Sequence, residues 1–396
     1  MNLLIFNCGS SSQGFKVYQT AEGAEPAVIA SGKARNVATQ TRAEASLEWH
    51  IGADSGVLTT NLPTHRRAAE IILALLKEHA VRVDAVGHRF VHGGDRFDRS
   101  VQIDAASLED LRRCLPFAPL HNPNSFSVIE VCLRQLPGVL QYAVFDTAFH
   151  AGMPAKSSTY ALPRDLAAQF GYRKYGFHGL SYQYVSAKTA EFLGRPLNSL
   201  KLILCHLGTG GSSVAALKDG HTLDTSMGYS PLPGLVMSTR SGDLDPEIAL
   251  DLVRRGRTPD EVSSLLNNQS GLLGLSGYSS NLAEIIEAAA GGNPDCQRAY
   301  DVYVHRLSFY IGAFHWLLGG ADCIVFTDDI GLHSWKLRER VCTGAEDLGL
   351  LLDREANRLA PADHPALITL PASKIQAAVV PTDEEIIILR EVLALM

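Results

Sequence analysis

The fold is decided by LLIFNCGSSSQGFKVY, residues 3–18, and by its counterpart LILCHLGTGGSSVAAL, residues 202–217. In both stretches an apolar strand ends in a cluster of glycine and serine, and a second strand follows directly. This pattern is typical of a β-hairpin with a small-residue tip. A second pair, YAVFDTAF (142–149) and CIVFTDDIG (323–331), is typical of buried parallel strands. The pairs indicate either two duplicated α/β domains or an incidental likeness between strand–turn segments, and we expect the duplication.

Helical patterns flank these strands. Residues 66–80 place apolar side chains on one face, namely Ala68, Ile71, Ile72, Leu75 and Leu76, and Thr64 precedes them as a candidate N-cap. Near the end of the chain, Thr382 and Glu385 form a capping-box pattern before a helix over 386–395. We expect a first domain over 1–148, completed by a C-terminal helix over about 383–396, and a second domain over 149–382.

Bulk composition limits the possible functions. The 396 residues carry a net charge of −7, with 46% hydrophobic and 19% charged residues, as in an ordinary soluble globular protein. This charge predicts no nucleic-acid partner and no anionic membrane partner. The seven cysteines lack a C-x-x-C pair, so free thiols are expected rather than disulfides or a zinc site. Together with the lack of a leader pattern at Met1, they predict a cytoplasmic protein.

A long irregular stretch, DTSMGYSPLPGLVMSTRSGDLDP (224–246), contains a single basic residue, Arg240. Its prolines and glycines predict a loop rather than a helix or strand, and long ordered loops are usually functional. Arg240 is therefore a candidate anion-binding arm.

Four further side chains are candidates for chemistry. Arg89 lies on a predicted strand over 84–92, and its fork suits a carboxylate or phosphate, although a lone arginine is more often a surface ion pair. Asp146 ends an apolar strand, where an unpaired charge is costly, so an arginine or a metal ion should pair with it. His178 lies beside Gly179 in an aromatic segment, and His206 ends a predicted strand before LGTGG; a structural role is the alternative for each histidine.

Four strings, AVGHRFVHGGDRF (85–97), AVFDTAFH (143–150), RKYGFHG (173–179) and residues 224–246, resemble the acetate kinase family closely. The resemblance extends from NCGSSS (7–12) to VVPTDEE (379–385). It implies the superfamily of acetate and sugar kinases, heat-shock chaperones and actin, with two duplicated actin-like (ribonuclease H-like) domains flanking a central cleft. It also implies Mg²⁺-dependent, reversible phosphoryl transfer between ATP and acetate, giving acetyl phosphate and ADP, in a homodimer.

The resemblance also implies roles for single residues. Arg89, Asp146, His178 and Arg240 would be catalytic, and Asn7 and Glu384 would be associated with the metal. The substrate would contact Arg89 and a methyl slot made of Val91, Leu120, Phe177 and Pro231. Phosphate and nucleotide would contact Ser10, Ser11, Ser12, His206, Gly208, Thr209, Gly210, Asp329 and Gly331. Val91 narrows the slot in favour of acetate over propionate, a preference of about 1–3 kcal/mol for one methylene.

The chain departs from the family on the nucleotide side. Gln13-Gly14 replaces Leu-Lys, and Lys16, on the same strand face as position 14, is a candidate substitute for the missing lysine. Thr209 replaces an asparagine, Tyr182 replaces a histidine, and residues 279–283 lack two charged groups of the family. In the predicted nucleotide loop over 328–333, Asp329 adds a negative charge. Its repulsion of a nucleotide phosphate at a distance of about 4 Å could reach about 4 kcal/mol.

Three functions remain open at this point. The first is acetate kinase activity with ATP. The second is the same reaction with pyrophosphate and phosphate in place of ATP and ADP, because Asp329 would crowd the adenosine loop. The third is a propionate kinase or a catalytically weak regulatory paralogue, and the complete set of candidate catalytic residues argues against the weak paralogue.

Overall fold

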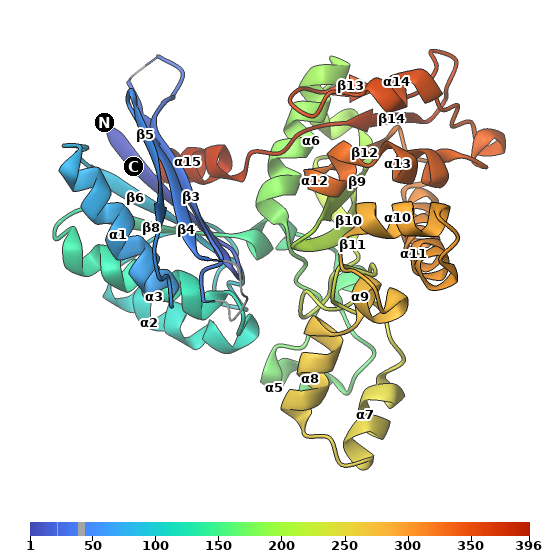
Figure 1. Ribbon diagram of the computed structural model, residues 1–396, viewed down its shortest axis with the longest axis horizontal. Helices are drawn as coiled ribbons and strands as arrows, with labels where there is room; N and C mark the ends of the chain where they lie inside the picture. Colours follow the sequence, from blue (N-terminus) through green and yellow to red (C-terminus); the bar gives the residue numbers. More distant parts are fainter. Residues whose placement is uncertain (22, 39–43) are drawn as a thin grey trace. The chain divides into compact units, whose positions relative to one another are not determined.

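The computed structural model describes residues 1–21, 23–38 and 44–396. The chain forms two compact units (Figure 1). The first unit contains Met1–Ala151 together with Asp383–Met396, and the second contains Gly152–Thr382. Each unit has its own sheet and its own apolar core, as the internal duplication predicts.

The first unit is built on an eight-stranded sheet in the order β5-β4-β3-β2-β1-β6-β8-β7. Its strands are β1 (Asn2–Cys8), β2 (Ser12–Gln19), β3 (Ala27–Arg35), β4 (Ser46–Ile51), β5 (Asp54–Thr59), β6 (Ala85–Phe90), β7 (Val101–Gln102) and β8 (Leu140–Phe145). Its helices are α1 (His65–Glu78), α2 (Ala105–Arg113), α3 (Asn122–Gln135) and α15 (Glu384–Leu395), with 3₁₀ turns at Leu115–Phe117 and Asp146–His150. The β1–β2 pair is the predicted hairpin, and β1, β6 and β8 run parallel.

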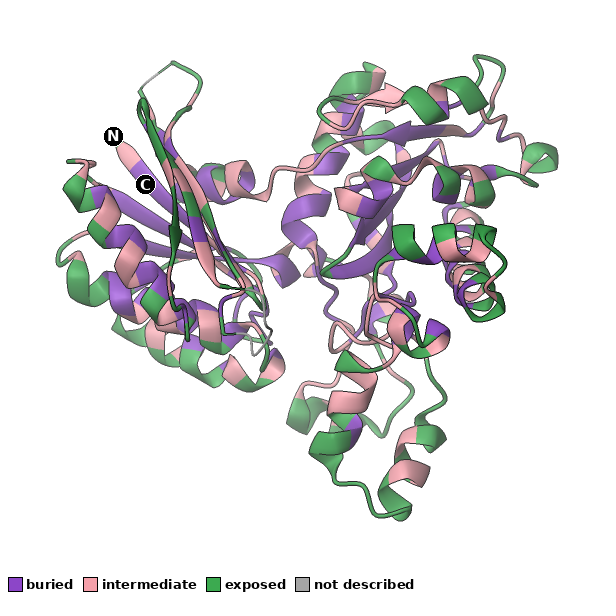
Figure 2. Ribbon diagram, viewed as in Figure 1, coloured by how far each residue is buried: buried purple, intermediate pink, exposed green. Residues whose placement is uncertain are grey.

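Both faces of this sheet are covered. Helices α1 and α3 pack on one face, and Thr64 caps α1 by accepting a hydrogen bond from the Arg67 amide at 3.1 Å, as predicted. Of the predicted apolar face, Ala68, Ile72 and Leu76 are buried, whereas Ile71 and Leu75 are half-buried. On the other face α15 approaches β6 so closely that a Cβ at Gly87 would lie 2.9 Å from Ile388 and Val392. Figure 2 shows the buried strands of both sheets in purple.

The second unit is built on a six-stranded sheet in the order β11-β10-β9-β12-β14-β13. Its strands are β9 (Lys201–Gly208), β10 (Gly211–Lys218), β11 (His221–Thr225), β12 (Cys323–Thr327), β13 (Ala366–Leu367) and β14 (Gln376–Val379). Its helices are α4 (Ala155–Ser158), α5 (Arg164–Phe170), α6 (Gly179–Leu193), α7 (Pro246–Arg254), α8 (Pro259–Asn268), α9 (Gly271–Ser276), α10 (Leu282–Ala290), α11 (Pro294–Leu318), α12 (Asp328–His333), α13 (Trp335–Cys342) and α14 (Arg354–Leu359). Short 3₁₀ turns occupy Leu197–Ser199 and Glu346–Leu348. The second predicted hairpin is β9–β10, and β12 is the predicted buried parallel strand beside β9.

Three local predictions were wrong. The N-cap of α15 is Asp383, which accepts from the Ile386 amide at 3.2 Å, and the helix begins at Glu384, whereas Thr382 was predicted to cap it. The strand predicted over 84–92 is shorter, because Val91 and the residues after it turn away from the sheet. The segment predicted as a loop over 328–333 is the short helix α12, which starts directly after β12 with Asp328 at φ +63°.

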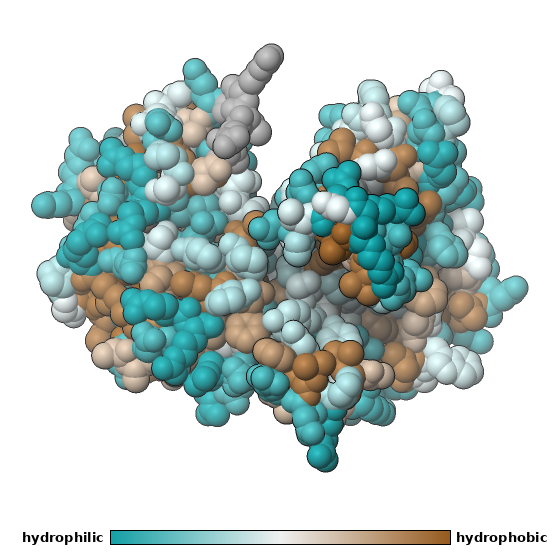
Figure 3. Space-filling model, turned by 90° about the horizontal axis from the view of Figure 1, so that it is seen from below, coloured by the Kyte–Doolittle hydropathy of each residue, from teal (hydrophilic) through white to brown (hydrophobic). Residues whose placement is uncertain are grey.

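Residues 226–245 form neither helix nor strand, as predicted for the stretch around Arg240. On helix α7, which follows this loop, Ile248, Leu250 and Val253 are exposed. Figure 3, a view from the α7 and α8 side, shows such apolar side chains scattered among polar ones. All seven cysteines are free and buried. Within the part of the chain that the structure describes, no helix is both long and apolar enough to cross a bilayer.

Candidate active site

In the first unit, Arg89 and Asp146 meet at the carboxyl ends of neighbouring parallel strands. Arg89 is the last residue but one of β6, and Asp146 follows β8 directly, so the register of the sheet brings them together. Nη2 and Nε of Arg89 donate to Oδ2 of Asp146 at 2.7 and 3.1 Å. Asp146 is 1% exposed, and Arg89 is the charge partner that its burial was predicted to require.

The remaining guanidinium nitrogen of Arg89 is also engaged. Nη1 donates to Oδ1 of Asn7 at 2.9 Å and lies 3.1 Å from Oε2 of Glu384. Burial by itself would lower the pKa of Arg89, but the carboxylates of Asp146 and Glu384 raise it above its ordinary value. Arg89 therefore stays charged while three side chains from separate segments hold its guanidinium plane in place.

A group of acidic residues surrounds this pair. Asn7 donates from Nδ2 to Glu384 at 3.1 Å and to Glu385 at 2.9 Å, and Lys16 forms ion pairs with Asp383 at 3.2 Å and Glu385 at 3.5 Å. Two cations, Arg89 and Lys16, thus face the four carboxylates of Asp146, Asp383, Glu384 and Glu385. This excess of negative charge and oxygen atoms suits a hard divalent cation. Among the residues described, no group of three or more His, Cys, Asp or Glu could hold a metal by itself, so water or substrate oxygens would have to complete such a site.

Lys16 and position 14 face the same cluster. A Cβ at Gly14 would lie 3.7 Å from Oε1 of Glu385 and 3.9 Å from Cβ of Asn7. Burial would lower the pKa of Lys16, but Glu385 and Asp383 raise it above its ordinary value. Lys16 is therefore a charged anchor for the residues that begin α15.

The other predicted residues of the first unit lie around this edge of the sheet. Ser10 and Ser11 are exposed at the tip of the β1–β2 hairpin, and Ser12 begins β2. Val91 is buried and Leu120 is 48% exposed. Sequence reasoning missed Asn122, whose buried amide bonds the main chain of His92 at 3.1 and 2.9 Å and thereby links these two segments.

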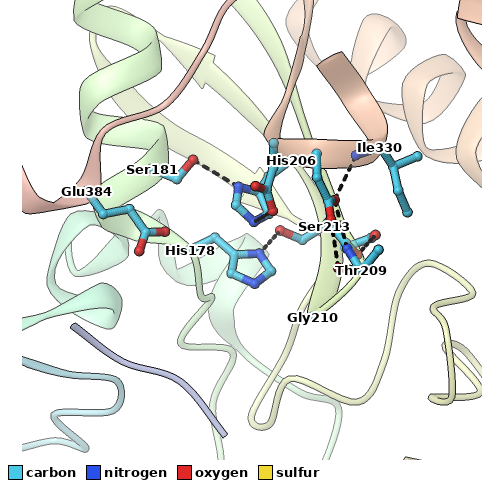
Figure 4. Close-up of polar contacts among 12 residues, drawn as sticks. His178, Ser181, His206, Thr209, Gly210, Ser213, Ile330 and Glu384 are labelled. Carbon is cyan, nitrogen blue, oxygen red and sulfur yellow. Dashed lines mark hydrogen bonds and ion pairs between the residues drawn. The ribbon is translucent and has the colours of Figure 1, made fainter. Parts of the chain in front are cut away.

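In the second unit, two histidines stack on each other beside the β9–β10 hairpin. The rings of His178 and His206 are 4.1 Å apart at an angle of 28°. Nδ1 of His178 lies 2.8 Å from Oγ of Ser213, and Nδ1 of His206 lies 2.9 Å from Oγ of Ser181 (Figure 4). His178 precedes α6 with φ +58°, a left-handed conformation that is costly for a residue with a Cβ. Strain of this kind is concentrated at functional sites.

Arg240 approaches the same place from the long loop. A Cβ at Gly211 would lie 3.2 Å from Nη1 of Arg240 and 3.5 Å from Nε2 of His178, so both nitrogens approach one point of the hairpin. Arg240 donates to the carbonyl oxygens of Pro231 at 3.2 Å and Gly210 at 3.3 Å, and it lies 3.8 Å from the Met237 sulphur. Within residues 1–21, 23–38 and 44–396, no carboxylate forms an ion pair with it. A half-buried guanidinium held by neutral partners is suited to bind an anion.

Two aspartates follow β12 and contact the hairpin. Oδ2 of Asp328 lies 3.2 Å from Nε2 of His206, and a Cβ at Gly208 would lie 2.0 Å from the same oxygen, so only glycine fits there. Asp329 accepts from the amide and the hydroxyl of Thr209 at 2.9 and 2.7 Å. The Asp329 carboxylate therefore joins the hairpin tip to α12 and lies at the edge of the site.

A pocket of about 390 Å³ lies beside the Thr209–Asp329 contact. It is lined by Thr209, Asn281, Leu282, Ala283, Ile286, Glu287, Asp329, Ile330, His333, Ser334, Trp335 and Lys336. Asn281 caps α10 through the Ala283 amide, and Leu282, Ala283 and Ile286 of this helix give the pocket an apolar wall. A flat heterocycle would find apolar side chains and one indole ring in this pocket. Asp329 lines the pocket without filling it.

Helix α12 is held by Arg338, which is almost fully buried. Its Nη1 donates to the carbonyl oxygens of Gly331 and Leu332 at 2.8 and 2.7 Å, which are the groups left unpaired at the end of α12. Asn357 in turn accepts from Nε of Arg338 at 2.8 Å. Gly331, which was predicted to contact the nucleotide, is buried, and its carbonyl oxygen accepts a hydrogen bond from Arg338.

Replacing Asn357→Ala should lower the free energy of unfolding of the second unit by about 2–3 kcal/mol, because Nε of the buried, charged Arg338 loses its acceptor. Chemical denaturation followed by tryptophan fluorescence would measure this change. Asn267→Ala is the matched control, because the Asn267 amide donates to Ser263 on the surface of α8. Equal stability losses in the two variants would contradict the role assigned to Asn357.

The structure thus forms two groups of predicted residues, one in each unit. The first contains Asn7, Arg89, Asp146 and Glu384, and the second contains His178, His206, Thr209, Gly210 and Arg240. Phe177 is buried and Pro231 is half-buried in the second unit, while Val91 and Leu120 belong to the first. Sequence reasoning missed Ser181, Ser213 and Trp335, since single serines and a tryptophan carry no motif.

Comparison with known proteins identifies the family. The model of the acetokinase family matches residues 2–390. The chain is 42% identical over 400 residues to the acetate kinase of Dictyoglomus thermophilum, covering 99% of this chain and 98% of that protein. The crystal structure of acetate kinase from Entamoeba histolytica matches with a TM-score of 0.89 at 40% identity, covering 100% of both chains. A propionate kinase from Francisella tularensis matches with a TM-score of 0.89 at 34% identity and 98% coverage of both chains.

These matches cover both units and confirm the predicted fold class, an α/β protein of two actin-like domains. They extend through each segment that carries a candidate residue, from Asn7 in β1 to Glu384 in α15. The chain therefore belongs to the acetokinase family, a family of phosphotransferases that use a carboxyl group as acceptor.

Proposed function

We propose that this protein transfers a phosphoryl group reversibly between ATP and acetate, forming acetyl phosphate and ADP. The observation that carries the proposal is the approach of Arg240 and His178 to one point at Gly211. Phosphoryl transfer requires hydrogen-bond donors and positive charge around the equatorial oxygens of the moving group, and little covalent chemistry from the protein. Arg240, which forms no ion pair with the described carboxylates, and an imidazole nitrogen would supply this environment.

Each group of residues has its own part in the proposed mechanism. Arg240 would neutralise charge on the phosphoryl oxygens while His178 donates a hydrogen bond to them. Arg89 would orient an anionic substrate oxygen, and Asp146 fixes the plane of its guanidinium. Val91 and Leu120 in the first unit, and Phe177 and Pro231 in the second, remain the residues that the resemblance implies for the methyl group of acetate.

The acidic cluster of the first unit fits Mg²⁺. Oδ1 of Asn7 and Oε2 of Glu384, which both contact Nη1 of Arg89, would provide the protein oxygen atoms, and the cluster has more carboxylates than cations. Two protein ligands plus water and phosphate oxygens are the usual environment of this ion. When bound, Mg²⁺ would supply positive charge to the phosphates of the donor. Lys16 keeps Asp383 and Glu385 in place on either side of Glu384.

The pocket beside Thr209 favours ATP over pyrophosphate. Its apolar wall and Trp335 suit a nucleobase, for which pyrophosphate has no counterpart. A hydroxamate assay for acetyl phosphate tests the proposal, with ATP, GTP and pyrophosphate as donors and with acetate and propionate as acceptors. We expect turnover with ATP and acetate. Turnover with pyrophosphate but not with ATP would show that pyrophosphate is the phosphoryl donor. Inactivity of the folded protein with every donor would refute the proposed function.

Asp329→Asn should lower the KM for ATP about threefold to fivefold with little change in kcat. The substitution removes a negative charge beside the phosphate region, and an exposed charge interaction is worth up to about 1 kcal/mol. The asparagine oxygen can still accept from Thr209, so Asp329→Ala serves as the matched variant that also loses the tether. Steady-state kinetics with ATP varied would measure the effect. An unchanged or higher KM in Asp329→Asn would show that this carboxylate does not repel the donor.

A further inference from the structure

The further inference concerns a buried hydroxyl pair behind His178. Oη of Tyr182 and Oγ of Ser213 lie 2.5 Å apart, and Oγ of Ser213 lies 2.8 Å from Nδ1 of His178. Both hydroxyl residues are completely buried. One serine oxygen therefore stands between a phenol and an imidazole, in a place from which bulk water is excluded.

The three groups can share their protons in one consistent direction. Burial raises the pKa of Tyr182 well above its ordinary value, so the phenol keeps its proton and needs an acceptor. Oγ of Ser213 is within hydrogen-bond distance and can accept that proton. The single proton of Ser213 is then directed to Nδ1 of His178, the other group within its reach.

We propose that Tyr182 and Ser213 are positioning residues that fix the tautomer of His178, with Nδ1 as acceptor and Nε2 carrying the proton. This inference rests on the proposed function, because it gives Nε2 the hydrogen bond that would be donated to the phosphoryl group. The location of Nε2 agrees with it, since that atom faces Gly211 together with Nη1 of Arg240. The stacked ring of His206 and the left-handed backbone at residue 178 hold the imidazole in the same orientation.

The side chain at position 182 decides which way the hydrogen bond to Ser213 runs. The resembling family has a histidine at this place in its FHGTSH string, whereas this sequence reads FHGLSY. A histidine can be either donor or acceptor at each ring nitrogen, but a protonated phenol always has a proton to donate. With tyrosine at position 182, Oγ of Ser213 therefore always accepts a hydrogen bond from the phenol.

Nitrogen-15 NMR of histidine-labelled protein at pH 8.5 tests the proposal directly. Imidazoles are ordinarily neutral at this pH, and the protonated and bare ring nitrogens have distinct chemical shifts. The signal of His178 is identified by its loss in His178→Asn. In the wild-type protein we expect the tautomer with the proton on Nε2. In Ser213→Ala and Tyr182→Phe we expect a mixture of tautomers and a kcat about tenfold lower at an unchanged KM, as for the loss of one hydrogen bond.

Two control variants accompany the test. Ser186→Ala removes a buried hydroxyl from the same helix, where it bonds the main chain of Gln183, and Tyr303→Phe removes a buried phenol from the core. Neither should alter the signal of His178. A proton on Nδ1 in the wild type, or an unchanged tautomer in Ser213→Ala, would overturn the inference. Because the NMR signal does not depend on turnover, the inference and the proposed function fail separately.

Discussion

Arg240→Ala lowers kcat by about 10²–10³-fold while the protein remains folded; this is the result we expect from the geometry of the second unit. The loss is that of a charge-stabilising donor at the moving phosphoryl group. Stability should change little, because Arg240 forms no ion pair with the described residues and donates to two carbonyl oxygens and a sulphur. The hydroxamate assay gives kcat, and thermal unfolding should show a Tm lowered by no more than about 4 °C.

The matched control for this prediction is Arg254→Ala. Arg254 lies on the surface of α7, where it pairs with Glu247 at 3.0 Å, and its removal should change neither kcat nor Tm. Arg240→Lys separates charge from shape, because lysine keeps the charge but loses the planar fork. A kcat within threefold of wild type in Arg240→Ala would refute the role of this residue.

Arg89→Ala should cost both activity and stability. The substitution leaves the carboxylate of Asp146 buried without its guanidinium partner, and breaking such a pair costs about 3–5 kcal/mol. We expect faster hydrogen exchange in β6 and β8, the two strands that carry the pair, and a kcat at least about 10²-fold lower. Hydrogen exchange followed by mass spectrometry reports on the first unit separately from the second.

A double-mutant cycle makes this prediction specific. Adding Asp146→Ala to Arg89→Ala removes the uncompensated charge, so the double variant should be more stable than the single one while remaining inactive. Arg66→Ala is the control, because its ion pair with Glu130 lies on the partly exposed surface of α1 and α3 and contributes about 1 kcal/mol or less. If the losses of unfolding free energy in the two single variants added up in the double variant, Arg89 and Asp146 would not be energetically coupled, and the result would contradict the prediction.

Sequence reasoning succeeded where a pattern has one physical meaning. Apolar runs separated by a small-residue tip predicted the two hairpins, and an uninterrupted apolar run predicted the buried strand β12. A threonine before apolar residues at helical spacing predicted the capped helix α1. The partner of Asp146 was predictable in kind, since a buried carboxylate needs a cation, but the sequence left an arginine and a metal ion as alternatives. The loop around Arg240 was also predictable, because its prolines and glycines exclude regular structure.

The failures have equally local causes. Thr382 and Asp383 are both good N-cap residues, and the outcome depends on the approach of Lys16 to Asp383, which the sequence does not show. Helix α12 forms because buried Arg338 satisfies its terminal carbonyl oxygens, a contact from a separate helix. The pairing of Ser213 with His178 depends on the register of β9 and β10 beside α6, which no spacing along the chain encodes.

One consequence follows from the place of α15 in the first unit. This last helix covers β6 at Gly87 and contributes Glu384, although the whole second unit separates it from the rest of its own sheet in the chain. During translation, the early strands must therefore wait with an apolar face uncovered until the ribosome has made the final residues. A messenger RNA truncated near its end would yield a protein that can form the second sheet but lacks α15. The uncovered apolar face of the first sheet would then expose this protein to quality-control proteases.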